Sequence, residues 1–478
     1  MAEYNKLTPE LIGQLKKIVG EANCYVGEDI SADYSHDEMP IYGSQMPEMV
    51  CMPASTAEVA AIMMLCNDNK IPVTVRGAGT GLVGGATPLF GGVVLCTMRM
   101  DKILYYDMNN LLVHVQPGVR LCDLAADALE RDLMYPPDPG EKTGSLGGNV
   151  STNAGGMRAV KYGVTRDWVR AIEVVLAMTV VLPNGQILEL GRSVTKTSSG
   201  YSLLHLMIGS EGTLGVITEL TLKLIPNPKE DISFILPFAD IETAISAVPK
   251  IKLAGLSPQS IEFMERDIVD SSANYTGNKI IPTVIDGKEA GAYILVTLDG
   301  NDQDEIFQRA ETLAEIGDEI GAYDTLVLSH PADKRAVWEA RSAFLTVIEA
   351  ETDLIDEMDV VVPVDKIPTF LEYAHEVGDK YEVRIRSFGH AGDGNLHIYC
   401  CANDMDEDVF MERTSKVMAA AYEKCTELRG QVSGEHGIGY AKKEFLRESL
   451  GETAINLMAG IKQVFDPNMI LNPGKICN

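Results

Sequence analysis

The chain has 478 residues, of which 46% are hydrophobic, and its 69 Asp and Glu residues against 40 Lys and Arg residues give a formal net charge of -29. A chain of this length exceeds one ordinary hydrophobic core, so about two or three domains are expected. Binding to phosphates needs clustered Lys and Arg, so the acidic balance argues against nucleic acid and anionic membranes as partners. A basic protein partner and simple solubility both fit the charge, and solubility is the commoner reason for an acidic surface.

The nine cysteines are scattered along the chain without a C-x-x-C pair. Iron-sulfur clusters and zinc ribbons depend on such spacings, so neither is expected. Scattered thiols are typical of a reducing compartment, and no apolar run resembles a signal peptide or a membrane span. We therefore expect a cytoplasmic protein without a transmembrane segment.

In chain order, the first predicted elements are an amphipathic helix over residues 8–19, a capped apolar helix over 55–69 and a short strand over 71–75. Residues 91–225 contain short strands separated by glycines, with a hairpin signal at Asn184-Gly185. A proline-rich break at 225–231 separates this region from the next.

Beyond the break, strands alternate with helices, including one over residues 302–320, which indicates a largely antiparallel sheet with helices on one face. Helices over 406–429 and 441–463 lead to a final loop, FDPNMILNPGKICN. The pattern predicts an α+β protein.

Two glycine-rich loops indicate a large polar ligand. RGAGTGLVGG, at residues 76–85, lets backbone N–H groups approach a phosphate closely, because glycine lacks a Cβ and reaches positive φ cheaply. It contains one G-x-G-x-x-G match, but the acidic residue that a Rossmann fold places about 20 residues later is missing. A long loop with seven glycines follows at 136–163, and IGSEGTLGVIT begins at 208. Taken alone, the first loop is compatible with an ordinary turn in a β-rich domain.

Two of the eight histidines, His390 and His397, flank the turn in GHAGDGNLH. The flanking segments are predicted strands and Asp393-Gly394 is a hairpin signal, so both imidazoles are expected to converge at one turn. Glu435, in SGEHGIG, offers a third ligand. Two imidazoles and a carboxylate suit Zn²⁺, Fe²⁺ or Mn²⁺ better than Ca²⁺ or Mg²⁺. From spacing alone, histidines hydrogen-bonded to the hairpin backbone remain the alternative.

With LNPGK near the C-terminus, these motifs resemble those of the vanillyl-alcohol oxidase and p-cresol methylhydroxylase superfamily, in particular its branch of D-lactate dehydrogenases, glycolate oxidases and D-2-hydroxyglutarate dehydrogenases. The resemblance covers nearly the whole chain. It implies a two-lobed FAD-binding domain and a substrate (cap) domain with a largely antiparallel sheet covered by helices. We accordingly expect an N-terminal helical segment at residues 1–41, the FAD-binding domain at 42–227, the substrate domain at 228–410, and C-terminal helices with a loop returning to the flavin at 411–478.

The resemblance implies that FAD is bound with its pyrophosphate on the first glycine loop. Relatives with a covalent flavin often carry a histidine in that loop, whereas this loop has Ala78 and Thr80, so a non-covalent FAD is expected. The implied cofactor contacts are Arg76, Gly77, Gly79, Thr80, Gly81, Gly84, Gly85, Pro137, Asp138, Ser145, Gly148, Asn149, Ser151, Gly155, Gly163, Glu211, Gly212, Ile217 and Asn472.

The resemblance also supports the metal triad His390, His397 and Glu435, and it adds two catalytic candidates. His436 is the candidate base for the substrate hydroxyl, and Arg341, in VWEARSAF, is the candidate ligand of the substrate carboxylate. A satisfied loop histidine and a surface helix arginine are the respective alternatives.

These features predict oxidation of a D-2-hydroxy acid to the 2-oxo acid, with hydride transfer to flavin N5 and a metal that lowers the pKa of the hydroxyl. The acids Asp356, Glu357 and Asp359 stand where hydroxyglutarate-oxidising relatives tend to carry a basic residue, so a monocarboxylate is favoured, lactate first and glycolate next. A D-2-hydroxyglutarate substrate, metal-free oxidation of an alcohol or phenol, and a flavin-binding subunit of a larger glycolate-oxidising complex are the alternatives.

Electrons must leave the chain, because the sequence contains no iron-sulfur pattern, no haem motif and no second dinucleotide fold. The candidate acceptors are electron-transferring flavoprotein, a quinone, an iron-sulfur partner subunit and O₂. We expect electron-transferring flavoprotein, since the chain is acidic and carries no predicted membrane anchor.

Overall fold

The computed structural model describes residues 3–166, 175–191 and 198–477. They form two compact units. Unit 1 comprises Met1–Gly155, Gly163–Asn227 and Glu435–Asn478, and unit 2 comprises Gly156–Tyr162 and Pro228–Gly434. The chain thus leaves unit 1 twice, for residues 156–162 and again for residues 228–434.

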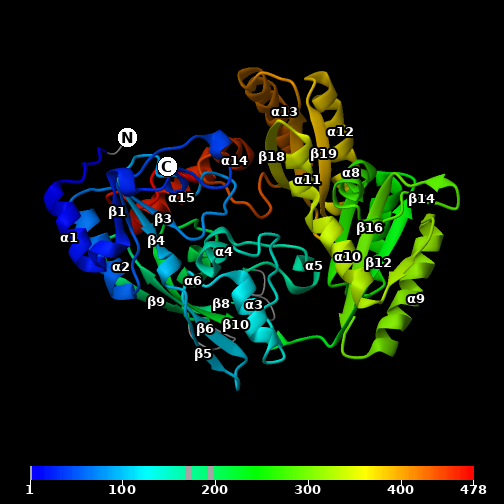
Figure 1. Cartoon of the computed structure of the whole chain (residues 1–478), viewed down its shortest axis with the longest axis horizontal. Coiled ribbons are helices and arrows are strands. Elements are labelled where there is room, and N and C mark those ends of the chain that lie inside the picture. Colours follow the sequence, from blue (N-terminus) through cyan, green and yellow to red (C-terminus); the bar gives the residue numbers. More distant parts are fainter. Residues whose placement is uncertain (1–2, 167–174, 192–197, 478) are drawn as a thin grey trace. The chain divides into compact units, whose positions relative to one another are not determined.

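Unit 1 is built on two sheets (Figure 1). The first sheet contains the strands Cys24–Val26 (β1), Met49–Cys51 (β2), Val73–Arg76 (β3) and Val93–Cys96 (β4). Their order is β1-β2-β4-β3, in which β2, β4 and β3 are parallel and β1 is antiparallel to β2. The second is antiparallel, with the order β5-β6-β10-β8-β9; its strands are Ile103–Asp107 (β5), Leu112–Val115 (β6), Val175–Val181 (β8), Ile187–Gly191 (β9) and Val216–Lys223 (β10). A two-stranded ribbon joins Leu133–Met134 (β7) to Ile225–Pro226 (β11).

The first two helices of unit 1 begin at the residues that the sequence predicted as caps. Thr8 accepts a hydrogen bond from the N–H of Leu11 at the start of the first helix, and Ser55 does the same for Glu58 at the second. The Asn184-Gly185 turn joins β8 to β9 as predicted, with Leu182 N–H donating to the Gln186 carbonyl. The helices are Pro9–Val19 (α1), Thr56–Asp68 (α2), Leu121–Leu129 (α3), Leu146–Thr152 (α4), Leu203–Met207 (α6), Lys443–Leu450 (α14) and Glu452–Phe465 (α15).

One helix prediction and one loop prediction are wrong. The single helix expected over 441–463 is broken into α14 and α15 at Gly451, whose φ of +79° belongs to the left-handed region that interrupts a helix. The glycine-rich stretch 136–163, expected to be an extended loop, contains α4 in unit 1 and the short helix Ala159–Tyr162 (α5) in unit 2. Ser145 caps α4 by accepting from the N–H of Gly148, at 3.3 Å.

Unit 2 is organised around a seven-stranded sheet in which every pairing is antiparallel, as the sequence predicted (Figure 1). The order is β17-β12-β16-β13-β19-β20-β18. The strands are Glu230–Phe238 (β12), Ser260–Glu265 (β13), Ala292–Gly300 (β16), Leu326–Leu328 (β17), Leu354–Val361 (β18), Arg384–His390 (β19) and Asn395–Ala402 (β20). A small hairpin, Val284–Ile285 (β14) with Lys288–Glu289 (β15), lies outside this sheet.

Helices cover both faces of this sheet, and the expectation of helices on one face is wrong. One face packs against Arg266–Thr276 (α8), Pro331–Ser342 (α10) and Phe344–Glu351 (α11). The other packs against Ile241–Leu253 (α7), Gln303–Ile320 (α9), Ile367–Lys380 (α12) and Glu407–Glu427 (α13). The reason lies in the strands, since β16 and β20 are buried along almost their whole length. Side chains that point to both faces of the sheet are therefore apolar or shielded, and helices must pack on both faces.

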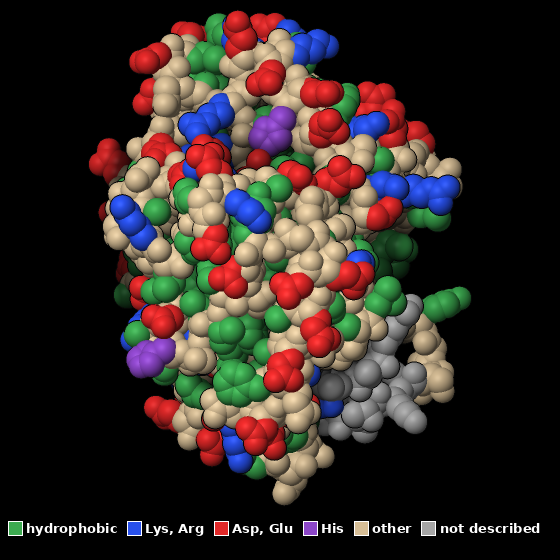
Figure 2. Space-filling model, turned by 90° about the vertical axis from the view of Figure 1, so that its right-hand side faces the viewer, with side chains coloured by type: hydrophobic (Ala, Val, Ile, Leu, Met, Phe, Trp, Pro, Cys, Tyr) green, Lys and Arg blue, Asp and Glu red, His purple; other side chains and the backbone are tan. Residues whose placement is uncertain are grey.

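The visible face of the molecule in Figure 2 carries many acidic side chains, with Lys and Arg scattered among them. Among the described residues drawn there, no extended basic area is seen. No helix in the described part of the chain combines the length and apolarity that crossing a bilayer requires.

Candidate functional site

The histidine turn of unit 2 is a β-hairpin, as predicted. β19 ends at His390, β20 begins at Asn395, and these two residues are register partners. Gly394 closes the turn with a φ of +89°, and a Cβ added to it would lie 2.0 Å from the carbonyl oxygen of Val362, so no other residue fits without a shift.

The hairpin brings the two imidazoles together. His397 pairs with Phe388 across the strands, which places His397 and His390 on the same sheet face as diagonal neighbours. Their Nε2 atoms are 3.4 Å apart, and both side chains are buried. Two nitrogen ligands at about 2.0–2.1 Å from a tetrahedral ion lie about 3.3–3.4 Å apart. The separation therefore fits two imidazoles that hold one metal ion.

Glu262 on β13 fixes the orientation of His390. Its carboxylate is fully buried and lies 2.8 Å from His390 Nδ1, which leaves Nε2 pointing toward His397. A carboxylate behind a ligating histidine is the usual arrangement at metal sites, because it sets the tautomer and the ring orientation. Burial acts to raise the pKa of Glu262, but the charges and hydrogen bonds of His390 and Arg341 outweigh it and hold that pKa below its ordinary value.

Arg341 lies in the last turn of α10 and is buried rather than on the helix surface. Its Nε and Nη2 donate to Glu262 Oε2 at 3.1 and 2.8 Å, and its guanidinium carbon lies 4.5 Å from the ring centre of Phe388. Arg has five N–H groups, so the Nη1 side retains the donors needed for a second bidentate carboxylate. Glu262 therefore joins the predicted metal ligand His390 to the predicted substrate ligand Arg341.

The three acids of β18 have different surroundings, although all are buried. Asp359 accepts from the Asn395 amide, the Ser433 hydroxyl and the Gly434 N–H at 2.7–2.9 Å, so it holds the chain in place just before Glu435. Glu357 Oε1 lies 3.6 Å from His397 Nδ1. Asp356 accepts from the N–H of Glu357. The acid that faces the histidines is therefore Glu357.

In unit 1, the predicted cofactor residues of the two glycine loops lie side by side. A Cβ on Gly77 would be 2.2 Å from Ser145 Oγ, so the first loop touches the start of α4. A Cβ on Gly144 would lie 3.6 Å from Thr80 Oγ1, a second contact between these loops. Gly85 is different, since an added Cβ would meet nothing within 4 Å. Glycine is thus required at Gly77 by close packing, and it leaves open space at Gly85.

The segment IGSEGTLGVIT, which begins at residue 208, and the C-terminal loop join the same region. Asn472 accepts from the Val75 N–H at 2.9 Å and donates to the Glu211 carbonyl at 2.9 Å. Glu211 N–H in turn donates to the Ser151 carbonyl at 2.8 Å. The predicted residues Glu211, Ser151 and Asn472 are therefore connected to β3, which leads into the first loop.

Glu435 and His436 belong to unit 1, whereas His390 and His397 belong to unit 2. Within unit 1, a Cβ on Gly155 would be 3.1 Å from Glu435 Oε1. The carboxylate of Glu211 accepts from the N–H groups of Ile438 and Gly439 at 2.8 and 2.7 Å. The segment that carries Glu435 and His436 is thus attached to two of the predicted cofactor loops, and the complete metal triad stays a prediction.

The sequence matches two family models: FAD binding domain over residues 47–191, and FAD linked oxidases, C-terminal domain, over residues 227–476. It is 54% identical to a D-lactate dehydrogenase of Anaerostipes hadrus, over 99% of this chain and 98% of that protein. It is 35% identical to a glycolate oxidase subunit of Bacillus subtilis, over 98% and 97% of the two chains. These matches extend over both units.

The chain belongs to the FAD-linked oxidases. It is accordingly an FAD-dependent oxidoreductase with the fold of p-cresol methylhydroxylase, to which it is 17% identical with a TM-score of 0.78 over 100% of this chain and 98% of that one. Likeness at that identity shows the fold alone.

FAD fits the described residues of this FAD-linked oxidase. The glycines of the first loop remove side chains where the backbone would approach a pyrophosphate, and the space at Gly85 is open. All of the predicted FAD contacts lie in unit 1, including Pro137, Asp138 and Gly163. Ile217 lies at the start of β10.

Two charged residues that sequence reasoning missed, Lys475 and Asp37, lie beside this loop. Lys475 is fully buried and donates to the Gly85 carbonyl at 2.6 Å; burial lowers its pKa to about 7. Asp37 accepts from the Met39 N–H at 3.2 Å, a Cβ added to Gly81 would lie 3.5 Å from its Oδ2, and burial raises its pKa. Burial also raises the pKa of Glu211. Lys475 stands in the LNPGK motif, which was a signal for its importance, whereas nothing in the local sequence pointed to Asp37.

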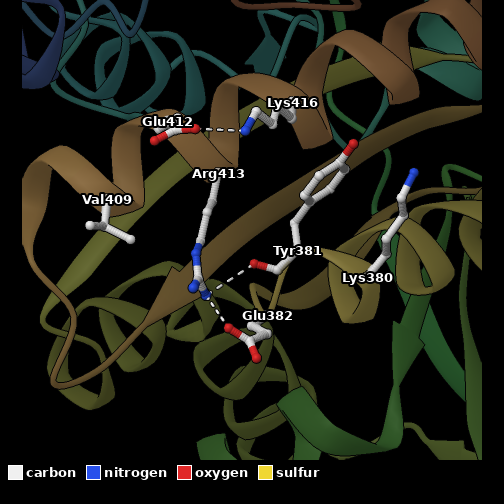
Figure 3. Close-up of a pocket in the computed structure, with 7 residues that line it drawn as sticks. All are labelled: Lys380, Tyr381, Glu382, Val409, Glu412, Arg413 and Lys416. Carbon is white, nitrogen blue, oxygen red and sulfur yellow. Dashed lines mark hydrogen bonds and ion pairs between the residues drawn. The ribbon is translucent and has the colours of Figure 1, made fainter.

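A pocket of about 330 Å³ lies outside the predicted site, between α12 and α13 of unit 2 (Figure 3). Four of its five charged residues pair within the pocket itself: Arg413 with Glu382 at 2.5 Å, and Lys416 with Glu412 at 2.7 Å. The charges of these two pairs are therefore internally balanced, and we assign the pocket no ligand.

Proposed function

We propose that this FAD-linked oxidase is a metal-dependent dehydrogenase that oxidises a D-2-hydroxy acid, with D-lactate preferred, to the 2-oxo acid. The observation that carries the proposal is the buried pair His390 and His397, with Nε2 atoms 3.4 Å apart and a carboxylate behind one ring. The relatives named D-lactate dehydrogenase, at 54% and 36% identity, support the choice of substrate.

The proposed roles follow from the chemistry of each group. His390, His397 and Glu435 would hold one Zn²⁺, Fe²⁺ or Mn²⁺ ion, which lowers the pKa of a bound hydroxyl. FAD, held without a covalent bond, supplies the hydride acceptor. His436 takes the hydroxyl proton, since a neutral imidazole can act as a general base. Arg341 binds the substrate carboxylate with the donors that Glu262 leaves, and Glu262 positions Arg341 and His390 together.

The buried acids support a monocarboxylate. A second substrate carboxylate near Glu357 would meet a like charge in a buried environment, which is costly. Lactate and glycolate avoid this repulsion, and D-2-hydroxyglutarate does not. The relatives named glycolate oxidase subunit make glycolate the second candidate.

We propose electron-transferring flavoprotein as the electron acceptor and the cytoplasm as the location. The scattered cysteines of the sequence provide no iron-sulfur ligands, so the electrons leave the chain. The nine cysteines are all free in the structure, in keeping with a reducing compartment.

The test is reduction of the bound flavin, followed by its visible absorption under nitrogen. D-lactate should bleach the flavin band faster than glycolate, and D-2-hydroxyglutarate should be slowest. L-lactate is the matched control and should leave the band unchanged. Absence of bleaching with D-lactate, glycolate and D-2-hydroxyglutarate alike would refute the proposed activity. Turnover with electron-transferring flavoprotein, quinone analogues and O₂ then ranks the acceptors, and a faster rate with either of the others would refute the proposed partner.

A further inference from the structure

Two cysteines of unit 1 face each other across an antiparallel strand pair. Cys24 on β1 and Cys51 on β2 are register partners. The preceding pair is hydrogen-bonded, because Met52 N–H donates to the Asn23 carbonyl at 3.0 Å. Bonded and non-bonded pairs alternate along an antiparallel ladder, so Cys24 and Cys51 occupy a non-hydrogen-bonded pair, in which the side chains come closest. Both side chains lie in the same buried hydrophobic cluster.

This arrangement suits a disulfide. A non-hydrogen-bonded pair has a Cα separation of about 4.5 Å, which falls inside the range of about 4.4–6.8 Å that disulfides require. Cys51 is fully buried, while Cys24 retains 9% exposure at the edge of its cluster, which gives a small oxidant access to one of the two sulfurs.

We propose that Cys24 and Cys51 form a dithiol–disulfide pair, which a peroxide converts into a cross-link that holds residues 27–48 against the FAD loop. Cys24 Sγ attacks a peroxide oxygen and the O–O bond breaks, giving a sulfenic acid and one water. Cys51 Sγ then attacks Cys24 Sγ, the S–S bond forms, and the S–O bond breaks to release a second water. Two electrons pass from the two thiols to the peroxide, and no other reductant is needed.

The thiols have the asymmetry that this order of attack requires. The hydrogen bond with Cys51, aided by the charge of Lys16, lowers the pKa of Cys24, so Cys24 is the more readily ionised member. The same hydrogen bond and burial raise the pKa of Cys51. The charge of Glu21 acts to raise the pKa of Cys24, against the effect of Lys16. Cys66 on α2 acts to raise the pKa of Cys51 further.

The closed segment is connected to the FAD loop by several contacts. Arg76 Nη1 donates to the His36 carbonyl at 2.7 Å, and its guanidinium carbon lies 5.5 Å from the centre of the Tyr34 ring. A Cβ added to Gly81 would lie 3.5 Å from Asp37 Oδ2. Glu38 N–H donates to the Gly81 carbonyl at 3.0 Å. A covalent tie at the base of this segment therefore restrains the residues that hold the FAD loop in shape, and FAD should leave more slowly.

The experiment uses the FAD-loaded protein, either reduced with dithiothreitol and desalted under nitrogen or treated afterwards with equimolar hydrogen peroxide. We expect the intact mass to fall by two hydrogens, and peptide mapping without reductant to join the Cys24 peptide to the Cys51 peptide. FAD release after dilution, followed by flavin fluorescence, should be several-fold slower in the oxidised form. Reduction with dithiothreitol should restore the original rate.

Cys24→Ser and Cys51→Ser should each abolish the cross-link and the effect of peroxide on FAD release, whereas the control Cys66→Ser should keep both. Oxygen addition at Cys24 without a cross-link, or a Cys51–Cys66 link, would overturn the pairing. A cross-link that leaves the FAD release rate unchanged would overturn the connection to the FAD loop. The wild-type comparison needs no variant, so it decides the question even if a substitution prevents folding.

Discussion

Replacing Glu262 by Gln tests whether this buried carboxylate organises the site in unit 2. The substitution preserves side-chain size but removes the charge between His390 and Arg341. Loss of a carboxylate behind a ligating histidine typically lowers metal affinity about 10–100-fold. We therefore expect metal retention after dialysis against a weak chelator to fall by that factor.

The same change should lower the free energy of unfolding. Arg341 is 7% exposed in its side chain and gives two hydrogen bonds to Glu262, so its charge would lose its counter-ion inside the protein. Breaking a buried ion pair costs about 3–5 kcal/mol. Because Gln keeps one acceptor oxygen, we expect a smaller loss of about 2–3 kcal/mol in the free energy of unfolding, measured by urea denaturation of the metal-free protein. Glu262→Leu should reach the upper end of the range.

Glu265→Gln is the matched control, because it removes another β13 carboxylate that pairs with a histidine. Glu265 lies 3.2 Å from His375, whose side chain is 37% exposed, so solvent screens the pair and the loss should stay below about 1 kcal/mol with metal content unchanged. The reasoning is refuted if Glu262→Gln keeps wild-type metal content, or if it unfolds no more easily than the control.

Four further predictions follow from other residues. His390→Ala and His397→Ala should each lose the bound metal in elemental analysis while retaining FAD, and metal content equal to wild type in both would remove the case for the site. Gly77→Ala should lower both the Tm of the FAD-free protein and the affinity for FAD, because its Cβ meets Ser145. Gly85→Ala should lower the affinity for FAD alone. Gly140→Ala, whose Cβ has nothing within 4 Å, is the control and should change neither quantity. Lys475 has a folded-state pKa of about 7 against 10.5 in the unfolded chain, so between these pH values the unfolded state binds more protons and the stability that this residue contributes rises with pH. Between about pH 7 and 9, the free energy of unfolding of wild type should therefore rise by about 2 kcal/mol relative to that of Lys475→Met. A difference between the two proteins that does not change with pH would contradict the pKa shift. Arg341→Lys should raise KM for D-lactate at least about 10-fold, because an ammonium cannot replace the planar fork that contacts Glu262 and a substrate carboxylate together.

Local sequence patterns were sufficient where the determining chemistry is local. The Asn184-Gly185 turn and the turn between His390 and Asn395 are set by residues within a few positions, so both hairpins were predicted correctly. The caps at Thr8 and Ser55 likewise set the starts of α1 and α2. The glycine loops indicated a large polar ligand, because close approach of the backbone requires glycine itself, and the family resemblance implied that this ligand is FAD.

The residues that hold the site residues in position could not be predicted from local sequence patterns. Glu262 lies 128 residues before His390, and only the register of β13 beside β19 brings them together. An acid in the apolar strand SIEFME was the available signal, since a buried carboxylate needs partners, but it did not say which ones. The second helical layer of unit 2 was missed for a similar reason, because an apolar strand pattern shows burial without showing which helix covers each face.

Unit 1 is assembled from segments at both ends of the chain, and this determines when it can be completed on the ribosome. Unit 2 has all seven strands of its sheet by Ala402 and closes its contacts by Gly434. The Lys475 bond to the Gly85 carbonyl spans 390 residues, which corresponds to about 20–80 s of synthesis at about 5–20 residues per second. The FAD loop therefore lacks its buried cation and the contacts of Asn472 until Asn472 and Lys475 have been synthesised. Unit 2 is the part that can mature first, and the flavin site is the last to acquire its native contacts.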